Sequence, residues 1–386
     1  MIRVINTEKI PIKMWIDEVE PNAYAQIKNL ANLPFAFHHI AIMPDCHSGY
    51  GMPIGGVLAA KDVIIPNAVG VDIGCGMCAV KTSLKQIDRE TLKTIVGKIR
   101  NTIPLGFEHY SHKQPAGLMP EKSPDYGVVA REWENALTQV GTLGGGNHFI
   151  EIQKESGGNI WIMVHSGSRN IGKQVADYYN KTAKKLDSKI DPKIPPGFDL
   201  AFLPIESKEG QNYIAEMNFC VQFALKSRKR MMEIICDIFL EKFSEIEFEP
   251  MINIEHNYAS FEKHFGEPVW VHRKGATLAS KGTIGIIPGS QGTKSYIVRG
   301  LGNPESFMSC SHGAGRTMSR HEAIRVLSVE EEAKKLEKQG ILHSIRGKRD
   351  LDEAPSAYKD ISKVMEAQKD LVEVLTELSP LAVVKG

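Results

Sequence analysis

The chain has 386 residues, with 47 Lys and Arg against 46 Asp and Glu, so its formal net charge is +1. This balance excludes a protein that coats nucleic acid through net charge alone, although it permits a local basic groove. A hydrophobic content of 42% and a charged content of 24% are ordinary for a globular protein.

The sequence also argues against export and membrane insertion. No apolar run approaches the roughly 20 residues that span a bilayer. The first fifteen residues lack the uninterrupted apolar region of a secretory signal. The six cysteines are too sparse to look like a disulfide framework. We therefore expect a cytoplasmic protein with no membrane partner.

The first predicted elements are buried strands that open into glycine-rich loops. Apolar, β-branched runs stand at 38–44 (HHIAIMP), 63–69 (VIIPNAV) and 160–167 (IWIMVHSG), and each borders a glycine cluster. Such runs are typical of buried strands. Because binding and catalytic residues gather on loops at strand ends, we expect functional side chains at these boundaries.

Helices are predicted in three further segments. The first is 211–243, and the second is the charged run 330–338, which predicts a solvated helical face. In the third, 356–378, apolar residues spaced by three and four give one apolar face that ends before Pro380. The proline-rich stretch 181–199 predicts a surface loop.

The length suggests roughly two to three domains, but the chain shows no clean linker. Candidate site residues run from Asp45 to Lys385. If they form one site, residues 1–386 fold as a single interwoven domain, and the length overestimates the number of domains.

Five residues at predicted strand and loop boundaries form a candidate metal site. One carboxylate, one thiolate and three imidazoles suit Mn, Fe, Co or Zn better than Mg or Ca. A bridging thiolate could hold two ions, which suits phosphoryl chemistry. Taken singly, each histidine is more often a hydrogen-bonded core residue than a ligand. The five are Asp72 and Cys75 of VGVDIGCGM, His148 after GTLGGGN, His165 at the end of IWIMVH, and His256 in EHNYA.

Two neighbouring features allow other interpretations. Cys75 and Cys78 form a CxxC pair, which is also found in redox and zinc-ribbon sites. The other four cysteines lack that spacing, so we interpret Cys75 as a ligand and Cys78 as structural. Asp45 and His47, in MPDCHSGYGMPIG, either support the metal ligands or face the substrate. A turn capped by Asp45 with a packed His47 fits equally well.

A further group of residues predicts a nucleotide pocket. The loop GTLGGGNH lacks the Gly-Lys-Ser/Thr of a P-loop, but its glycines can offer backbone N–H groups to phosphate. Asn147 is placed to bond a phosphate oxygen, and the carboxylate of Glu151 is a natural acceptor for the N1–H and N2–H₂ edge of guanine. The remaining candidates are Ser290 and Ser295 as small donors, Tyr358 for stacking on a base, and Lys385 for guanine O6.

The run SCSHGAGRTMSR (309–320) sets His312 among small residues. We interpret His312 as a nucleophile that carries a nucleotide, with Gly315 beside it as a further nucleotide contact. A tight turn with a core-facing histidine explains these twelve residues equally well. Arg316 and Arg320 lie four positions apart, so on a helix they would share a face and form a phosphate clamp.

These motifs resemble the RtcB family, the tRNA-splicing RNA ligases that use GTP, and the resemblance covers essentially the whole chain. It implies an α+β fold, a single domain with mixed β-sheets flanked by helices. The motifs are MPDCHSGYGMPIGG, VGVDIGCGM, GTLGGGNHFIEI, VHSGSRNIG, HNYA, RKGA, GIIPGSQGTKSYIVRGLG, SCSHGAGR, DEAPSAYKDI and the terminal VVKG.

The resemblance implies two Mn²⁺ ions at the five candidate ligands, a guanylylated His312, and GTP contacts at the pocket residues named above. The implied enzyme is a 3′-phosphate/5′-hydroxyl ligase, which joins an RNA 2′,3′-cyclic phosphate or 3′-phosphate to an RNA 5′-hydroxyl through an RNA-(3′)pp(5′)G intermediate. RNA repair and tRNA splicing both present such ends. An archease-like activator is a possible partner, and Arg316, Arg320, Asp45 and His47 are candidates for RNA or phosphate contacts.

One departure from the family pattern lies in the long helix, where Ser227 precedes Arg228 in place of the asparagine that we expect. Two other interpretations remain. A metal-dependent cyclic phosphodiesterase or phosphatase would need the metal residues but not Glu151 or Lys385. A noncatalytic RNA-binding relative would have no use for the metal residues.

Overall fold

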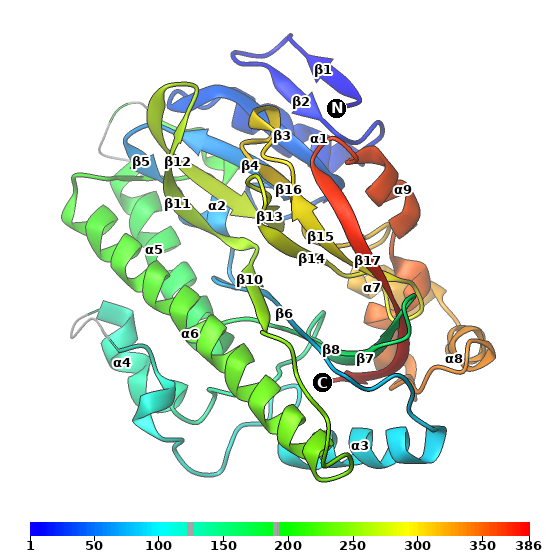
Figure 1. Ribbon diagram of the computed structural model, residues 1–386. Helices are drawn as coiled ribbons and strands as arrows, with labels where there is room; N and C mark the ends of the chain where they lie inside the picture. Colours follow the sequence, from blue (N-terminus) through cyan, green and yellow to red (C-terminus); the bar gives the residue numbers. More distant parts are fainter. Residues whose placement is uncertain (122–126, 188–190, 192) are drawn as a thin grey trace.

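Two β-sheets organise the chain (Figure 1). The computed structural model describes residues 1–121, 127–187, 191 and 193–386. The six-stranded sheet has the order β1 (Arg3–Ile5), β2 (Ile12–Met14), β3 (Ala36–His47), β4 (Ile54–Ala60), β12 (Glu267–Lys274), β11 (Asn257–His264). The seven-stranded sheet has the order β10 (Ile252–Glu255), β6 (Gly76–Lys81), β8 (Ile160–Ser166), β7 (Phe149–Glu155), β17 (Val372–Lys385), β15 (Ser295–Gly300), β14 (Ile284–Ile287).

The expected α+β class with mixed sheets is confirmed. In the six-stranded sheet β2 and β3 run parallel, whereas the other pairs are antiparallel. Two short antiparallel pairs complete the strands, β5 (Val63–Ile64) with β9 (Leu203–Pro204) and β13 (Ala276–Leu278) with β16 (Ser309–Ser311).

Helices flank the sheets, and the longest, α6, crosses the front of the molecule in Figure 1. Ser207 begins α6 because its hydroxyl accepts a hydrogen bond from the Gly210 amide. The helix predicted at 211–243 is confirmed with its bounds three residues earlier, and the helix at 330–338 corresponds to α8. The helices are α1 (Pro21–Ala31), α2 (Pro66–Val69), α3 (Arg89–Thr102), α4 (Gly127–Ala136), α5 (Arg169–Asp187), α6 (Lys208–Leu240), α7 (Arg320–Val326), α8 (Val329–Lys338) and α9 (Ile361–Ala367).

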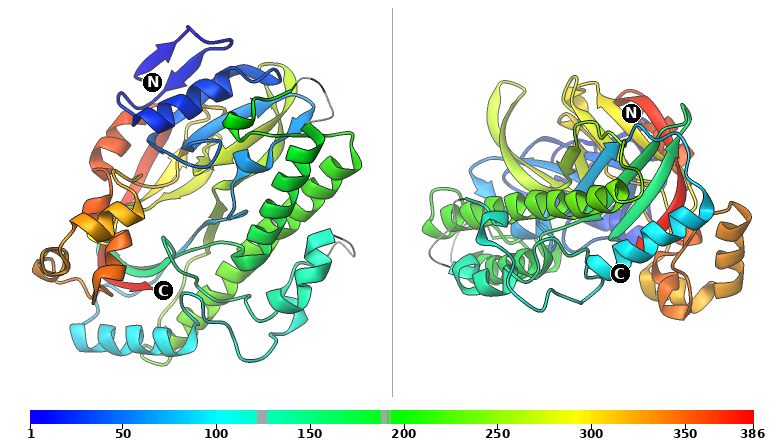
Figure 2. Two further views of the ribbon diagram at one scale, coloured as in Figure 1. Left: turned by 180° about the vertical axis from the view of Figure 1, so that it is seen from behind. Right: turned by 60° about the horizontal axis from the view of Figure 1, so that its bottom comes forward.

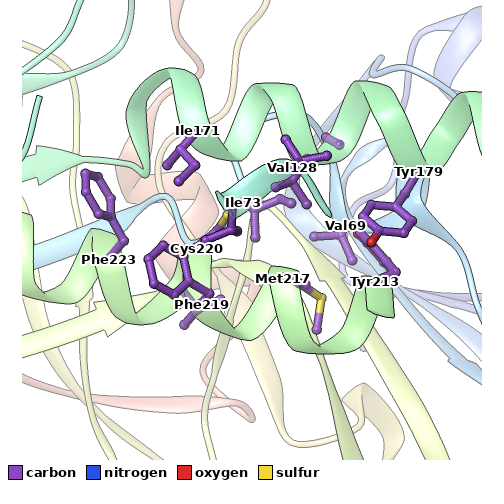
Figure 3. Close-up of a cluster of buried hydrophobic side chains, with 14 of the residues drawn as sticks. Val69, Ile73, Val128, Ile171, Tyr179, Tyr213, Met217, Phe219, Cys220 and Phe223 are labelled. Atoms are coloured by element: carbon purple, nitrogen blue, oxygen red, sulfur yellow. The ribbon is translucent and has the colours of Figure 1, made fainter. Parts of the chain in front are cut away.

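A hydrophobic cluster joins α4, α5 and α6 (Figure 3). Ile171 of α5 and Met217 and Phe223 of α6 are fully or almost fully buried in it. Ile73, which follows the candidate ligand Asp72, is buried in the same cluster. The loop that carries Asp72 is therefore anchored by apolar packing, which holds its position before any ligand binds. Figure 2 shows α5 and α6 side by side from two further directions.

The helix predicted at 356–378 is wrong over most of its length. A short helix, α9, ends at Ala367, and the chain then enters β17, which pairs with both β15 and β7. Ladder hydrogen bonds on both edges outweigh the local three-four spacing of the apolar residues. Pro380, expected to stop the helix, instead lies at a break in the β17–β7 register, where a proline costs no ladder hydrogen bond.

Two other predictions need correction. The run 63–69 is a strand only at its start, because Pro66 opens α2, where its fixed φ suits the first helical turn. The loop predicted at 181–199 is helical up to Asp187, the end of α5. Positions 188–190 and 192 of that stretch lie outside the described residues. Among the helices that the structure describes, none is long and apolar enough to cross a membrane.

Candidate metal and nucleotide site

A cavity of about 520 Å³ is lined by residues from both large sheets and from the segment after β16. Its size lies within the range of small-molecule sites. It gathers most of the residues that the sequence nominates. Those in its lining are His47, Asn147, Glu151, His165, Ser290, His312, Gly315, Arg316, Arg320, Tyr358 and Lys385.

The five candidate metal ligands converge as two groups that share one thiol. Cys75 lies with His165 and His256 in one group and with Asp72 and His148 in the other. Within each group the ligand atoms lie within 4.8 Å of one another. The Cys75 sulfur is 3.3 Å from Nε2 of His165 and 3.5 Å from Nε2 of His148. Two ions held by these groups would share the Cys75 sulfur.

Strand order explains why these residues meet. The strands β10, β6, β8 and β7 are consecutive neighbours in the seven-stranded sheet, and they alternate in direction. Cys75 precedes β6 and His148 precedes β7, whereas His165 lies near the end of β8 and His256 follows β10. Antiparallel neighbours place the start of one strand beside the end of the next, so all four reach the same edge.

The chemistry of this donor set fits divalent metal ions. Burial lowers the pKa of His165 and of His256 well below the usual range, so both imidazoles are neutral and offer lone pairs. Their Nε2 atoms face each other at 3.4 Å. Burial also raises the pKa of the Cys75 thiol. Burial alone would raise the pKa of Asp72, but its hydrogen bond with His148 at 3.0 Å, the charge of His148, and contacts with Cys75 and Arg169 together bring it below the usual value.

Cys78 is separated from this cluster. Its sulfur is fully buried and lies 3.8 Å from the backbone oxygen of Arg228. Neither group of potential ligands contains it. The structure thus offers no support for a CxxC metal or redox pair among the described residues.

Arg228 of α6 ties together the segments that carry the ligands. Its buried guanidinium donates to the backbone oxygens of Gly74 at 2.9 Å, Ser166 at 2.8 Å and Ile254 at 3.2 Å. These acceptors lie within two residues of Cys75, His165 and His256. A single buried cation therefore fixes three ligand-bearing segments relative to one another.

Ser227, the departure in the long helix, has an identifiable role. Its hydroxyl accepts a hydrogen bond from the Gly141 amide at 2.9 Å, at the start of the loop GTLGGGN. Serine thus anchors this loop to α6.

Asp45 contacts His312 rather than the metal residues. Its Oδ2 atom lies 2.6 Å from the His312 Nδ1 and accepts hydrogen bonds from the backbone amides of His312 at 3.0 Å and Gly313 at 3.3 Å. Asp45 itself is fully buried and therefore cannot face the substrate. Gly315, at φ +75°, packs against the Asp45 backbone, and a Cβ at this position would lie only 2.2 Å from the Asp45 backbone oxygen. His47 packs beside this group, with its Nδ1 2.9 Å from the same oxygen.

This contact assigns the two ring nitrogens of His312. A nitrogen that faces a carboxylate carries the proton, so Nδ1 donates to Asp45 and Nε2 keeps its lone pair. The His312 ring lies next to the His256 ring, with 4.8 Å between their centroids. The interpretation of His312 as a mere turn residue is not supported, because its side chain reaches the cavity beside the metal-type cluster.

Arg316 and Arg320 do not share a helix face, contrary to the sequence prediction, because α7 begins only at Arg320. They meet instead at Glu353, which forms ion pairs with Arg316 at 3.1 Å and with Arg320 at 2.8 Å. Arg316 also lies over the Tyr358 ring, 5.1 Å from its centroid, and the Tyr358 hydroxyl donates to Glu353. Burial alone would raise the Glu353 pKa, but Lys385 and the two arginines bring it below the usual value.

The end of the cavity on β7 and β17 holds Glu151 and Lys385. Burial raises the pKa of Glu151 to about 8, against the opposing effects of Gln153 and Lys385. Gln153 donates to Glu151 and, at 3.0 Å, to the hydroxyl of Ser295. Ser295 is not in the described cavity lining and supports Glu151 through Gln153. Lys385 donates to the Gly146 backbone oxygen at 2.6 Å, which confirms its inward position.

Asn147 and Ser290 line the cavity between these groups. The Asn147 backbone oxygen lies 3.1 Å from Nδ1 of His165, which orients that imidazole. The hydroxyl of Ser290 lies 3.0 Å from that of Thr293. Both residues form part of the cavity wall.

Three residues of this site were missed by sequence reasoning. Gln153, Arg228 and Glu353 each act by bridging segments that are distant in the chain. For Glu353 the sequence offered one signal, because this charged residue stands in the motif DEAPSAYKDI. Arg228 stands in the long helix beside Ser227, where the family pattern was noted, but nothing in the sequence predicts the backbone oxygens that it binds.

Two kinds of comparison with known proteins agree with this geometry. A family model described as tRNA-splicing ligase RtcB matches residues 26–123 and 113–386. The RNA-splicing ligase RtcB of Escherichia coli K12 is 40% identical over 410 residues, covering 99% of both chains. The tRNA-splicing ligases RtcB of Methanococcus maripaludis and Thermococcus kodakarensis are each 32% identical, covering 98% and 94% of this chain and 95% and 90% of their own lengths.

The two-sheet α+β fold places two metal-type groups beside His312 in one cavity, an arrangement suited to phosphoryl-transfer enzymes. With a family model matching most of the chain and relatives above 30% identity over nearly all of it, this chain belongs to the RtcB family.

Proposed function

We propose that this RtcB-family ligase joins RNA ending in a 2′,3′-cyclic phosphate or 3′-phosphate to RNA with a 5′-hydroxyl, with GTP as the nucleotide and two Mn²⁺ ions. The observation that carries the proposal is the position of His312. Its Nδ1 is held by Asp45, and its ring lies beside the two groups that share Cys75. Residues 1–386 form one catalytic domain in this proposal, which the cavity lining from both sheets supports.

Asp72, Cys75, His148, His165 and His256 would hold the two ions. When bound, the ions would activate water for opening the cyclic phosphate and neutralise charge on the reacting phosphates. The borderline N, S and O donor set favours manganese, iron, cobalt or zinc over magnesium. Three buried imidazoles and a buried thiol have no role in a simple RNA-binding surface.

His312 acts as the nucleophile toward GTP. The Nε2 lone pair attacks the α-phosphorus, an N–P bond forms, and the bond to pyrophosphate breaks. Nδ1 keeps its proton and continues to donate it in the hydrogen bond to Asp45. The carboxylate of Asp45 stabilises the positive charge that develops on the ring. Arg316 and Arg320, gathered by Glu353, are placed to neutralise the leaving phosphates.

Guanine recognition falls to Glu151 and Lys385. The carboxylate of Glu151 would accept from N1–H and N2–H₂, and the ammonium of Lys385 would donate to O6. Asn147 and Ser290 are placed for phosphate or ribose oxygens, and Tyr358 offers the face that Arg316 leaves uncovered.

The RNA steps complete the cycle. The 3′-phosphate attacks the His312-bound GMP, which breaks the N–P bond and forms an RNA-(3′)pp(5′)G anhydride. The 5′-hydroxyl of the second RNA then attacks the 3′-phosphorus, and GMP leaves. A 3′-phosphate is a poor electrophile, and the anhydride supplies the leaving group that it lacks.

All six cysteines are free thiols, which fits a reducing compartment, and we place the reaction in the cytoplasm.

A labelling experiment tests this proposal. The protein is incubated with Mn²⁺ and α-labelled GTP and then denatured, and we expect label that is lost in acid and stable in alkali, as for a phosphoramidate. His312→Ala should carry none. A second assay supplies a broken RNA with a cyclic phosphate and a 5′-hydroxyl, with and without an archease-like activator. Opening of the cyclic phosphate without labelling or joining would instead indicate a metal-dependent cyclic phosphodiesterase.

A further inference from the structure

Tyr50 is an aromatic side chain at the cavity that the reaction described above leaves without a role. It lies on the loop between β3 and β4 and is 75% exposed, the most exposed tyrosine or tryptophan among the described residues. It nevertheless lines the same cavity as His312 and Arg320. A large aromatic side chain that is exposed at a binding cavity is a candidate for ligand contact, because its apolar surface gains free energy only when a ligand covers it.

The backbone under this exposed ring is held firmly. Lys274, a buried lysine of β12, donates to the Tyr50 backbone oxygen at 2.6 Å. Gln26 of α1 pairs with Gly49, accepting from its amide at 3.1 Å and donating to its oxygen at 2.5 Å. Gly51, at φ +67°, packs so closely that a Cβ would lie 2.4 Å from the Asp199 oxygen.

Such a loop presents the ring of Tyr50 at little entropic cost. Its main chain is fixed by hydrogen bonds on both sides, whereas the ring has no polar or aromatic partner among the described residues. A rigid backbone carrying a solvent-facing aromatic ring is the arrangement by which proteins stack single-stranded nucleobases. Preorganisation of this kind improves binding because less freedom is lost when the ligand arrives.

The position of Tyr50 indicates which base it would meet. The candidate guanine contacts Glu151 and Lys385 lie on β7 and β17 of the seven-stranded sheet, whereas Tyr50 lies on the loop that joins β3 and β4 of the six-stranded sheet. The strand β3 also carries Asp45, the partner of His312. The guanine pocket and Tyr50 are thus attached to different sheets, with His312 in the cavity that both line.

We propose that Tyr50 is a stacking platform for the 3′-terminal nucleobase of the RNA whose phosphate receives GMP from His312. The inference rests on the proposed function, since it assigns the RNA subsite of that same reaction. Stacking on a ring is tolerant of base identity, because every base has a π-face. This tolerance would suit a ligase whose substrates share an end chemistry rather than a sequence.

The test compares Tyr50→Ala, Tyr50→Phe and Tyr50→Trp in the full-length protein with Mn²⁺ and GTP. The probe is a single-stranded RNA oligonucleotide with a 3′-phosphate, and transfer of GMP to it is followed at varied concentration. Tyr50→Ala should raise the KM for this RNA about 5- to 150-fold, the range of one base–aromatic stack. Tyr50→Phe and Tyr50→Trp should stay within a few-fold of the parent protein.

A second probe separates stacking from a structural role. The second probe is the same oligonucleotide with an abasic 3′-terminal nucleotide. With the parent protein, its KM should be as high as the KM of the intact oligonucleotide with Tyr50→Ala. Combining the abasic probe with Tyr50→Ala should raise the KM no further. Tyr178→Ala on α5 is the matched control, since Tyr178 is 45% exposed and is not in the described cavity lining. It should leave both KM values unchanged.

Failure of the inference is distinguishable from failure of the proposed function. If the parent protein neither takes label from GTP nor joins RNA, the function itself is wrong. If the parent protein does both, an unchanged RNA KM in Tyr50→Ala overturns the platform. The platform is also overturned if Tyr50→Ala raises the KM for GTP in labelling of His312 as much as it raises the KM for RNA. Tyr50 would then contact the nucleotide instead.

Discussion

The carboxylate of Asp45 accepts three hydrogen bonds from the two-residue segment that begins at His312, one of them from the imidazole Nδ1 at 2.6 Å. The backbone bonds fix where the ring starts, and the side-chain bond fixes which nitrogen is protonated. Position and tautomer of the His312 ring therefore depend on a single buried residue.

Asp45→Asn tests this dependence. The amide keeps the shape but removes the charge that stabilises a positive imidazole, so we expect histidine guanylylation to slow by on the order of 10²-fold or more. Single-turnover labelling with α-labelled GTP measures it. Bound manganese should not change, because Asp45 belongs to neither ligand group. Labelling at the parent rate would show that the tautomer is set in another way.

Replacement of Cys75 should empty both metal positions together. The thiol belongs to both ligand groups, so Cys75→Ala removes a donor from each. Elemental analysis after equilibrium dialysis against Mn²⁺ should find less than a tenth of the parent content, with labelling of His312 lost in parallel. Cys78→Ala, three residues away and outside both groups, is the control and should keep its metal. Retention of one ion in Cys75→Ala would argue against a bridging thiolate.

Guanine binding should depend on pH through Glu151. Burial raises its pKa to about 8, so the group is protonated at neutral pH in the free protein and must ionise to accept from guanine N1–H and N2–H₂. The affinity for GMP, measured by calorimetry, should rise up to tenfold per pH unit below about pH 8 and level off above it. In Glu151→Gln the affinity should be weaker and flat over the same range. A flat profile in the parent protein would contradict the assignment.

A separate prediction concerns stability. Glu262 of β11 bonds His264 at 2.8 Å and pairs with the buried Arg273 at 2.5 Å. Burial alone would raise its pKa, but these partners bring it to about 2, below the ordinary 4.5. Its stabilisation is therefore complete above about pH 4.5 and is lost as the pH falls towards 2.

Glu262→Gln should lower the free energy of unfolding by about 2–3 kcal/mol at neutral pH, because Arg273 would remain buried without its counter-charge. Urea unfolding at pH 7 measures this change. Near pH 3 the difference between parent and variant should shrink. Glu267→Gln at the end of the same hairpin, where the pair with Lys61 is exposed, is the control and should change stability by less than 1 kcal/mol.

The sequence nominated all five residues of the two metal-type groups because they form a set, although each histidine taken singly is more often a core residue. One carboxylate, one thiolate and three imidazoles at predicted strand and loop boundaries can be recognised without a fold. The roles of Arg228 and Glu353 could not be read in this way. Each acts through backbone or side-chain partners that only strand order brings near, and an arginine or glutamate is otherwise a common surface residue.

The C-terminal prediction failed for a related reason. Residues 361–367 do form a helix, but the apolar spacing after Leu371 fits a helix and a strand equally well. The choice was made by β15 and β7, which flank β17 and lie far from it in the sequence. Because β17 carries Lys385, this error also hid how the end of the chain reaches the cavity.

The contacts of Arg228 have a consequence for the order of folding. The backbone oxygens that it binds belong to residues 74, 166 and 254, so the site closes only after loops of roughly ninety residues have been brought together. Contacts of such long sequence separation form slowly and late. Competence to bind metal would then appear at the last stage of folding, and recovery of manganese binding after denaturation should follow, rather than precede, the return of helical structure.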